Sequence, residues 1–141
     1  MFKKAWAIWK GNLRDGGGNI STESGVLKDA PYGFNARFDH GNGTNPEELI
    51  GAAHAACFSM ALSLALGEAG LTAESIETHA TVSLDKVGDG YEITASALKT
   101  TARIPGANKE NFLQIADKVK QSCPVSKVLK AKISLDATLA T

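Results

Sequence analysis

The sequence predicts an α+β fold in which most strands pair antiparallel, and three observations support this prediction. The first is the order of patterns: short strands, a long apolar helix, a strand hairpin, an amphipathic helix and a last strand. The second is a two-residue alternation that resumes directly after a glycine turn, as in antiparallel neighbours. The third is composition, because 43% apolar and 21% charged residues among 141 suit one globular domain, predicted over residues 1–141.

The charge balance and the cysteine content exclude several classes of protein. Fifteen Lys and Arg residues balance fifteen Asp and Glu residues, so we expect no nucleic-acid partner and no attraction to an anionic membrane. Two cysteines do not make a disulfide scaffold. The basic start over residues 1–10 contains too short an apolar run for an export signal, so we expect a cytoplasmic location.

The N-terminal third is rich in glycine and is predicted to form short strands. Side chains alternate over residues 5–9, which suits a strand, and the glycines at 16–18 end it. Two more short strands are predicted within residues 20–22 and 33–38. Arg37 falls near the end of the last of these strands.

A long helix is predicted to follow the next glycine-rich loop. Asn45 is a suitable N-cap, Pro46 suits the first helical position, and Glu48 occupies the acidic position of a capping box. Fourteen of the 18 residues from 49 to 66 are apolar, and the helix is expected to end near Gly70. Because a helix that is apolar all round is usually buried on several sides, we expect a buried central helix rather than a membrane span.

The second half begins with a predicted hairpin. Apolar and polar residues alternate over residues 76–84, which indicates a strand with one wet face. The turn sequence at 88–90 follows, and the alternation continues over residues 91–97 on the return strand. Pro105 and Gly106 then end the sheet pattern.

A second helix and a last strand complete the predicted fold. Asn108 is a suitable cap for the helix, and Cys123 with Pro124 ends it. One face of the helix carries an apolar stripe, formed by Phe112, Ile115, Ala116 and Val119. The last strand is expected to turn four side chains inward: Ile133, Leu135, Ala137 and Leu139.

The two cysteines have the most distinctive chemistry in the chain. Taken alone, each is most simply a small buried hydrophobe. Taken together they leave three interpretations: inert core thiols, one structural bridge, or a redox pair. If the thiols approach each other, the attacking one needs a nearby cation to become a thiolate. Cys123 lies at the negative end of its helix, where ionisation is disfavoured, so it suits the thiol that waits.

Arg37 is the candidate cation for Cys57, which is too far inside its helix to gain from the N-terminal dipole. Glu47 is free to bind the guanidinium fork, because Glu48 already takes the capping position. Ten residues separate Glu47 from Cys57, about 15 Å along a helix axis, so the two cannot touch within one chain. Either Arg37 spans this distance or a second subunit supplies one group, which suggests a homodimer with sites at its interface.

A metal site is the main competing chemistry. His54 and Cys57 lie three residues apart and can face one ion, with His40, His79 and Cys123 as other candidates. Structural zinc sites usually have short ligand pairs at both ends of the motif. Cys123 has no such neighbour, so we expect no metal. The sequence also lacks a glycine-rich phosphate motif, so nothing supports nucleotide binding.

Five further stretches of the sequence form a set of motifs: residues 32–38 (YGFNARF), 43–49 (GTNPEEL), 54–61 (HAACFSMA), 82–87 (VSLDKV) and 123–126 (CPVS). Together they resemble the OsmC/Ohr family of organic hydroperoxide peroxidases, and the resemblance covers nearly the whole chain. The second and third stretches are closer to the OsmC branch than to the Ohr branch. The resemblance implies an OsmC-like, intertwined homodimer with two central helices packed against sheets and active sites at the interface.

The same resemblance implies a thiol-dependent peroxidase of the antioxidant stress response, for which hydrogen peroxide is a poorer substrate than organic hydroperoxides. Cys57 matches the peroxidatic cysteine and Cys123 the resolving cysteine. Arg37 matches the activating arginine, and Glu47 matches its carboxylate partner. The resemblance further implies a Cys57 sulfenic acid, then a Cys57–Cys123 disulfide that an external dithiol reduces. A lipoyl protein is one suggested reductant, and no metal, haem or flavin is implied.

Two other functions are left open by the sequence. A non-enzymatic redox sensor would use the same cysteines to switch a partner interaction after one oxidation event. A small-ligand-binding dimer would contain the cysteines as inert core residues. Turnover with a dithiol favours the enzyme, whereas unchanged redox behaviour after Cys57→Ser favours the ligand-binding dimer.

Overall fold

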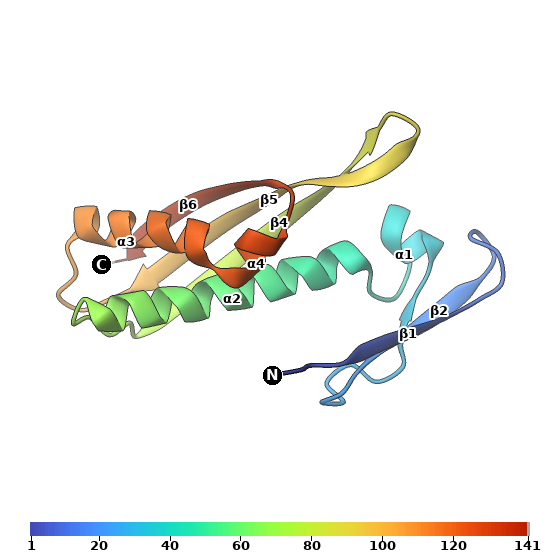
Figure 1. Ribbon diagram of the computed structural model, residues 1–141, viewed down its shortest axis with the longest axis horizontal. Coiled ribbons are helices and arrows are strands. Elements are labelled where there is room, and N and C mark those ends of the chain that lie inside the picture. Colours follow the sequence, from blue (N-terminus) through green and yellow to red (C-terminus); the bar gives the residue numbers. More distant parts are fainter. Residues whose placement is uncertain (141) are drawn as a thin grey trace. The chain divides into compact units, whose positions relative to one another are not determined.

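The computed structural model describes residues 1–140, and the chain divides into two compact units (Figure 1). The first unit is Met1–Leu49 and the second is Ile50–Thr141. The expectation that residues 1–141 form a single domain stays a prediction.

The first unit contains a three-stranded antiparallel sheet and one short helix. Its strands lie in the order β1 (Ala5–Lys10), β2 (Gly17–Thr22) and β3 (Ala30–Tyr32). The Trp9 ring from β1 packs at 5.4 Å from the Tyr32 ring across the sheet. The strands predicted at residues 5–9 and 20–22 are therefore confirmed.

The strand predicted within residues 33–38 is wrong, because this segment forms the one-turn helix α1 (Phe34–Phe38). In the helix Phe34 and Phe38 are four residues apart and their ring centroids approach to 5.0 Å. The Asn45 side chain donates a hydrogen bond to the Ala36 carbonyl and ties the turn to the following loop. Arg37 consequently lies in a helix and not at a strand end.

The long helix α2 (Pro46–Glu68) begins and ends as the sequence predicts. The Asn45 side chain accepts a hydrogen bond of 2.8 Å from the Glu48 backbone N–H, as an N-cap does. The Glu48 carboxylate accepts a hydrogen bond of 2.7 Å from the Thr44 hydroxyl. At the other end Gly70 adopts φ +75°, a left-handed conformation that commonly ends helices.

The second unit pairs a predicted hairpin with a third strand. β4 (Ser75–Val87) and β5 (Gly90–Arg103) are antiparallel, and a two-residue turn at Gly88 and Asp89 joins them. β6 (Lys132–Ala140) lies beside β5 and runs parallel to it. The prediction of mostly antiparallel pairing is confirmed, with β5 and β6 as the parallel exception.

Two helices connect β5 to β6 (Figure 1). The first is α3 (Lys109–Ser122), and the Asn108 side chain caps it by accepting a hydrogen bond from the Asn111 N–H. The second is the short α4 (Pro124–Val128), which begins directly after Cys123. The sequence predicted the first helix and its cap, but it did not predict the second.

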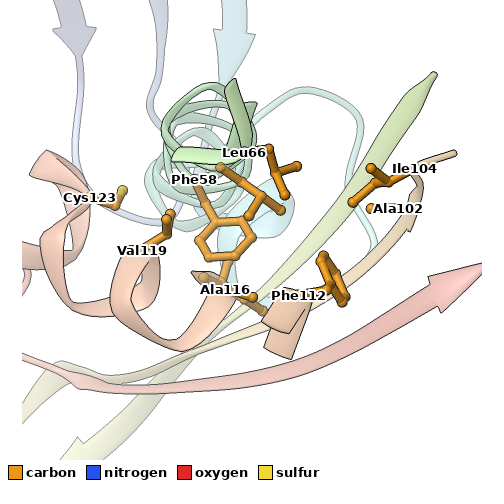
Figure 2. Close-up of a cluster of buried hydrophobic side chains, with 10 residues drawn as sticks. Phe58, Leu66, Ala102, Ile104, Phe112, Ala116, Val119 and Cys123 are labelled. Atoms are coloured by element: carbon orange, nitrogen blue, oxygen red, sulfur yellow. The ribbon is translucent and has the colours of Figure 1, made fainter. Parts of the chain in front are cut away.

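The core of the second unit lies where α2 and α3 meet the sheet (Figure 2). Its buried side chains come from α2 (Phe58, Leu62, Leu66), from β5 and its end (Leu98, Ala102, Ile104), and from α3 (Phe112, Ala116, Val119). The predicted inward side chains of β6 pack against this cluster, and Cys123 lies at its edge. The apolar stripe predicted for the second helix is therefore confirmed as its core-facing side.

Within this chain α2 is buried along one face only. Phe58 and Leu62 on that face are fully buried, whereas Met60 and Leu64 on the other face are 75% and 67% exposed. The sequence predicted burial on several sides, and the single chain provides it on one. The length and composition of α2 would also suit a membrane span, but the core helix of a soluble protein passes the same test.

We expect Leu62→Ala to lower the free energy of unfolding by about 2 to 5 kcal/mol, because it leaves a cavity beneath α2. Leu113→Ala makes the same change on the exposed side of α3 and should cost less than about 1 kcal/mol. Urea denaturation of both variants measures the two values. Equal losses would contradict the assignment of this core.

Candidate active site

Arg37 and Glu47 form a bidentate ion pair within the first unit. Arg37 Nη2 donates to Glu47 Oε1 at 2.8 Å, and Arg37 Nε donates to Oε1 and Oε2 at 3.2 and 3.3 Å. Glu47 is buried in the first turn of α2, and the Arg37 side chain is 38% exposed. The carboxylate therefore holds the guanidinium fork in one orientation while part of it stays accessible.

A cavity of about 300 Å³ adjoins Arg37 in the same unit. Its walls are mostly aromatic and apolar, formed by Trp9, Leu13, Tyr32, Phe34, Phe38 and Pro46. The sequence did not reveal this cavity, because its lining residues come from three separate segments of the chain. A cavity with apolar walls and a guanidinium at its edge suits a molecule with an apolar body and one polar end.

Cys57 and Cys123 meet within the second unit. Cys57 lies in the middle of α2 and Cys123 lies between α3 and α4. Both are free thiols, and each side chain acts on the pKa of the other. Packing of α2 and α3 on one face of the sheet thus joins two thiols that are far apart in the sequence.

The two thiols differ in how readily they ionise. Burial raises the pKa of Cys57, and this effect exceeds the lowering caused by a backbone hydrogen bond from Val125. Burial also acts to raise the pKa of Cys123, but hydrogen bonds outweigh it and hold that pKa below its ordinary value. The largest lowering of the pKa comes from the Ser126 backbone N–H, followed by Cys57, the Ser126 hydroxyl and the Val125 backbone N–H.

The expectation that ionisation of Cys123 is disfavoured is therefore wrong. Cys123 ends α3, as predicted, but it is also the N-cap residue of α4. The backbone N–H groups of Val125 and Ser126, at the start of α4, lower the pKa of the Cys123 thiol and favour its thiolate. Pro124 at the first position of α4 was the signal in the sequence, because proline often occupies that position.

The four predicted site residues thus occur as two pairs, one in each unit. Arg37 binds Glu47 in the first unit, and Cys57 contacts Cys123 in the second. The structure shows these contacts, while the catalytic roles of the four residues stay predictions.

His54 is a buried polar residue whose partners the sequence did not reveal. Its Nδ1 lies 2.7 Å from the Ser96 hydroxyl oxygen and its Nε2 lies 2.8 Å from the Ser126 hydroxyl oxygen. Burial lowers the pKa of His54, which favours the neutral ring. Among residues 1–140 no three His, Cys, Asp or Glu side chains are grouped closely enough to hold a metal ion.

Comparison with known proteins finds close similarity over most of the chain. The family model described as "OsmC-like protein" matches residues 39–138. Peroxiredoxin OsmC of Escherichia coli K12 is 61% identical over 139 residues, which cover 99% of this chain and 97% of that protein. The organic hydroperoxide resistance protein of Xanthomonas axonopodis pv. citri is 30% identical over 101 residues, or 71% of this chain and 69% of that protein.

A solved structure shares the fold. The crystal structure of the organic hydroperoxide resistance protein OhrB of Bacillus subtilis matches with a TM-score of 0.68 and 26% identity. The match covers 97% of this chain and 98% of that one. The arrangement of helices and strands is therefore that of the solved relative.

Because the two thiols are already in contact, we expect mild oxidation to form a disulfide within one subunit. Intact-mass spectrometry should show the loss of two hydrogens, with the subunit unchanged in size on a non-reducing gel. Cys57→Ser and Cys123→Ser should each prevent the change. A disulfide between subunits would contradict the contact.

Proposed function

The chain belongs to the OsmC-like protein family, and on this basis we propose that it is a cysteine peroxidase that reduces organic hydroperoxides to alcohols. The observation that supports the proposal most strongly is the pair of neighbouring free thiols, Cys57 and Cys123. This pair occurs in a chain that is 61% identical to a protein named Peroxiredoxin OsmC. A peroxidase of this kind needs one thiol to attack the peroxide and a second within reach to resolve the product.

In the proposed first step the Cys57 thiolate attacks the O–O bond of the hydroperoxide. One oxygen stays on sulfur as a sulfenic acid, and the other leaves as an alkoxide that takes a proton to become the alcohol. Because burial raises the pKa of Cys57, the thiolate needs a cation that its own surroundings in the second unit do not supply. Arg37 is proposed to supply that charge, and Glu47 to orient it.

In the proposed second step Cys123 attacks the sulfenic sulfur of Cys57. An S–S bond forms, the S–O bond breaks, and the departing hydroxide takes a proton and leaves as water. The contact between the thiols lets this step proceed without a large rearrangement. An external dithiol then reduces the disulfide by thiol–disulfide exchange, with a lipoyl protein as one suggested donor.

The cavity beside Arg37 supports an organic substrate over hydrogen peroxide. Its aromatic and apolar walls would bury an alkyl or aryl group, and Arg37 would bind the peroxide end. Hydrogen peroxide has no such group to bury. Larger apolar hydroperoxides are therefore the proposed substrates.

The exposed face of α2 supports a homodimer. Met60 and Leu64 are largely exposed on this face, together with small residues such as Ala53 and Ala56. Exposed apolar surfaces of this kind usually mark contact sites. A second copy of the chain, packed face to face on α2, is proposed to cover this surface. The proposed cellular location of the protein is the cytoplasm.

The peroxidase proposal predicts dithiol-dependent consumption of cumene hydroperoxide at many turnovers, with slower consumption of hydrogen peroxide. Cys57→Ser should abolish the activity, because it removes the attacking sulfur. Cys123→Ser should lose activity over successive turnovers, because its sulfenic acid is open to over-oxidation. Peroxide consumption would be followed in parallel for the three proteins.

Two other outcomes of this assay would favour the alternative functions. A single oxidation event without turnover would favour the redox sensor. Background consumption by the wild type and Cys57→Ser alike would favour a ligand-binding dimer with inert cysteines.

The dimer proposal predicts that Met60→Glu shifts the protein toward monomer, because it places a charge in an apolar contact. Val26→Glu introduces the same charge at a highly exposed loop of the first unit and serves as the control. Sedimentation equilibrium measures both masses. A wild-type monomer would overturn the proposal, as would a dimer unaffected by Met60→Glu.

A further inference from the structure

A chain of polar side chains leads from the core of the second unit to Cys123. His54 on α2 is fully buried, and its two ring nitrogens contact the hydroxyls of Ser96 on β5 and Ser126 on α4. Ser126 lies in the short helix α4, for which Cys123 is the N-cap residue, and its hydroxyl lowers the pKa of the Cys123 thiol as a hydrogen-bond donor. Three elements of the fold therefore contribute to one path of polar side chains that ends at a thiol.

The donor and acceptor capacity of these groups sets which atom donates in each hydrogen bond. A thiolate sulfur only accepts hydrogen bonds, so the Ser126 hydroxyl must donate its single proton to Cys123. The Ser126 oxygen can then only accept from His54, which places the ring proton on Nε2. Nδ1 of a neutral ring must accept, so the Ser96 hydroxyl donates to it. Every donor thus points toward Cys123.

These hydrogen bonds require the His54 ring to be neutral. Both partners of His54 are uncharged hydroxyls, and burial disfavours the imidazolium. The ring therefore acts as a fixed donor to Ser126 rather than as a base.

We propose that His54 and Ser126 are positioning residues for the resolution step, in which they orient a hydrogen bond onto Cys123 and stabilise its thiolate. The inference rests on the proposed peroxidase function, and neither residue touches the peroxide. The thiolate attacks the Cys57 sulfenic sulfur, the S–S bond forms, and hydroxide departs and takes a proton to become water. The hydrogen bond favours the reactant thiolate and so keeps a larger share of Cys123 ready to attack.

The location of His54 also argues for a specific role. The neighbouring positions on the buried face of α2 hold Phe58, Leu62 and Leu66. An apolar side chain at position 54 would continue this face without the cost of burying a polar ring. A merely structural histidine would stabilise the packing of α2, β5 and α4 but would leave the ionisation of Cys123 unchanged.

The first test measures the ionisation of Cys123 from the ultraviolet absorbance of its thiolate against pH, with Cys57→Ser as the common background. Adding Ser126→Ala, which changes only a half-buried side chain, should move the titration of Cys123 to higher pH. Ser126→Thr keeps the hydroxyl and should restore the original curve. His54→Leu should shift the curve in the same direction as Ser126→Ala.

A matched control comes from α2, the helix that carries His54. Ser59→Ala removes a part-buried hydroxyl of α2, which donates to Thr78 at 2.8 Å. It should leave the titration of Cys123 in place. A shift as large as that of Ser126→Ala would mean that loosened packing is the cause, and it would overturn the proposal.

The second test separates the two chemical steps in proteins that retain both cysteines. After mixing with cumene hydroperoxide, Ser126→Ala and His54→Leu should form the disulfide about tenfold more slowly, while Cys57 is oxidised at the wild-type rate. Unchanged titration and unchanged disulfide formation would overturn the proposal even if peroxidase turnover is intact. A shifted titration in a protein without turnover would instead refute the peroxidase function and leave the effect on Cys123 standing.

Discussion

The packing of α2 and α3 on one face of the β4–β5–β6 sheet is the constraint on which the rest of the second unit depends. It buries Phe58 and Leu62 against Phe112 and its neighbours, and it fixes how the two helices face each other. The contact between Cys57 and Cys123 exists only because of this packing. The proximity of the two thiols is thus a consequence of the hydrophobic core, and the proposed redox chemistry depends on apolar residues that take no part in the reaction.

The two units contain electrostatically different groups, two thiols in the second unit and an ion pair in the first. In the second unit, backbone and side-chain donors favour the thiolate of Cys123, whereas burial disfavours that of Cys57. The first unit holds a guanidinium whose orientation is set by a buried carboxylate. A thiol that its surroundings disfavour and a cation held in a fixed orientation are complementary. The proposed activation of Cys57 by Arg37 rests on this complementarity.

Most of the regular structure could be predicted from the sequence, because it depends on local signals. The caps at Asn45 and Asn108, the hairpin turn and the apolar stripes are all set by residues a few positions apart. The one-turn helices α1 and α4 were missed because five residues are too few to show a helical period.

Contacts between residues far apart in the chain were harder to predict from the sequence. The partners of His54 lie 42 and 72 residues away in the sequence, and only the fold reveals them. The pairing of Arg37 with Glu47 was predicted, because a spare carboxylate beside a capping acid needs a partner. The most direct test of the proposed activation of Cys57 by Arg37 is the rate at which cumene hydroperoxide oxidises Cys57 in a Cys123→Ser background, with and without Arg37→Met. We expect a much slower oxidation without the guanidinium, and equal rates would contradict the proposed activation.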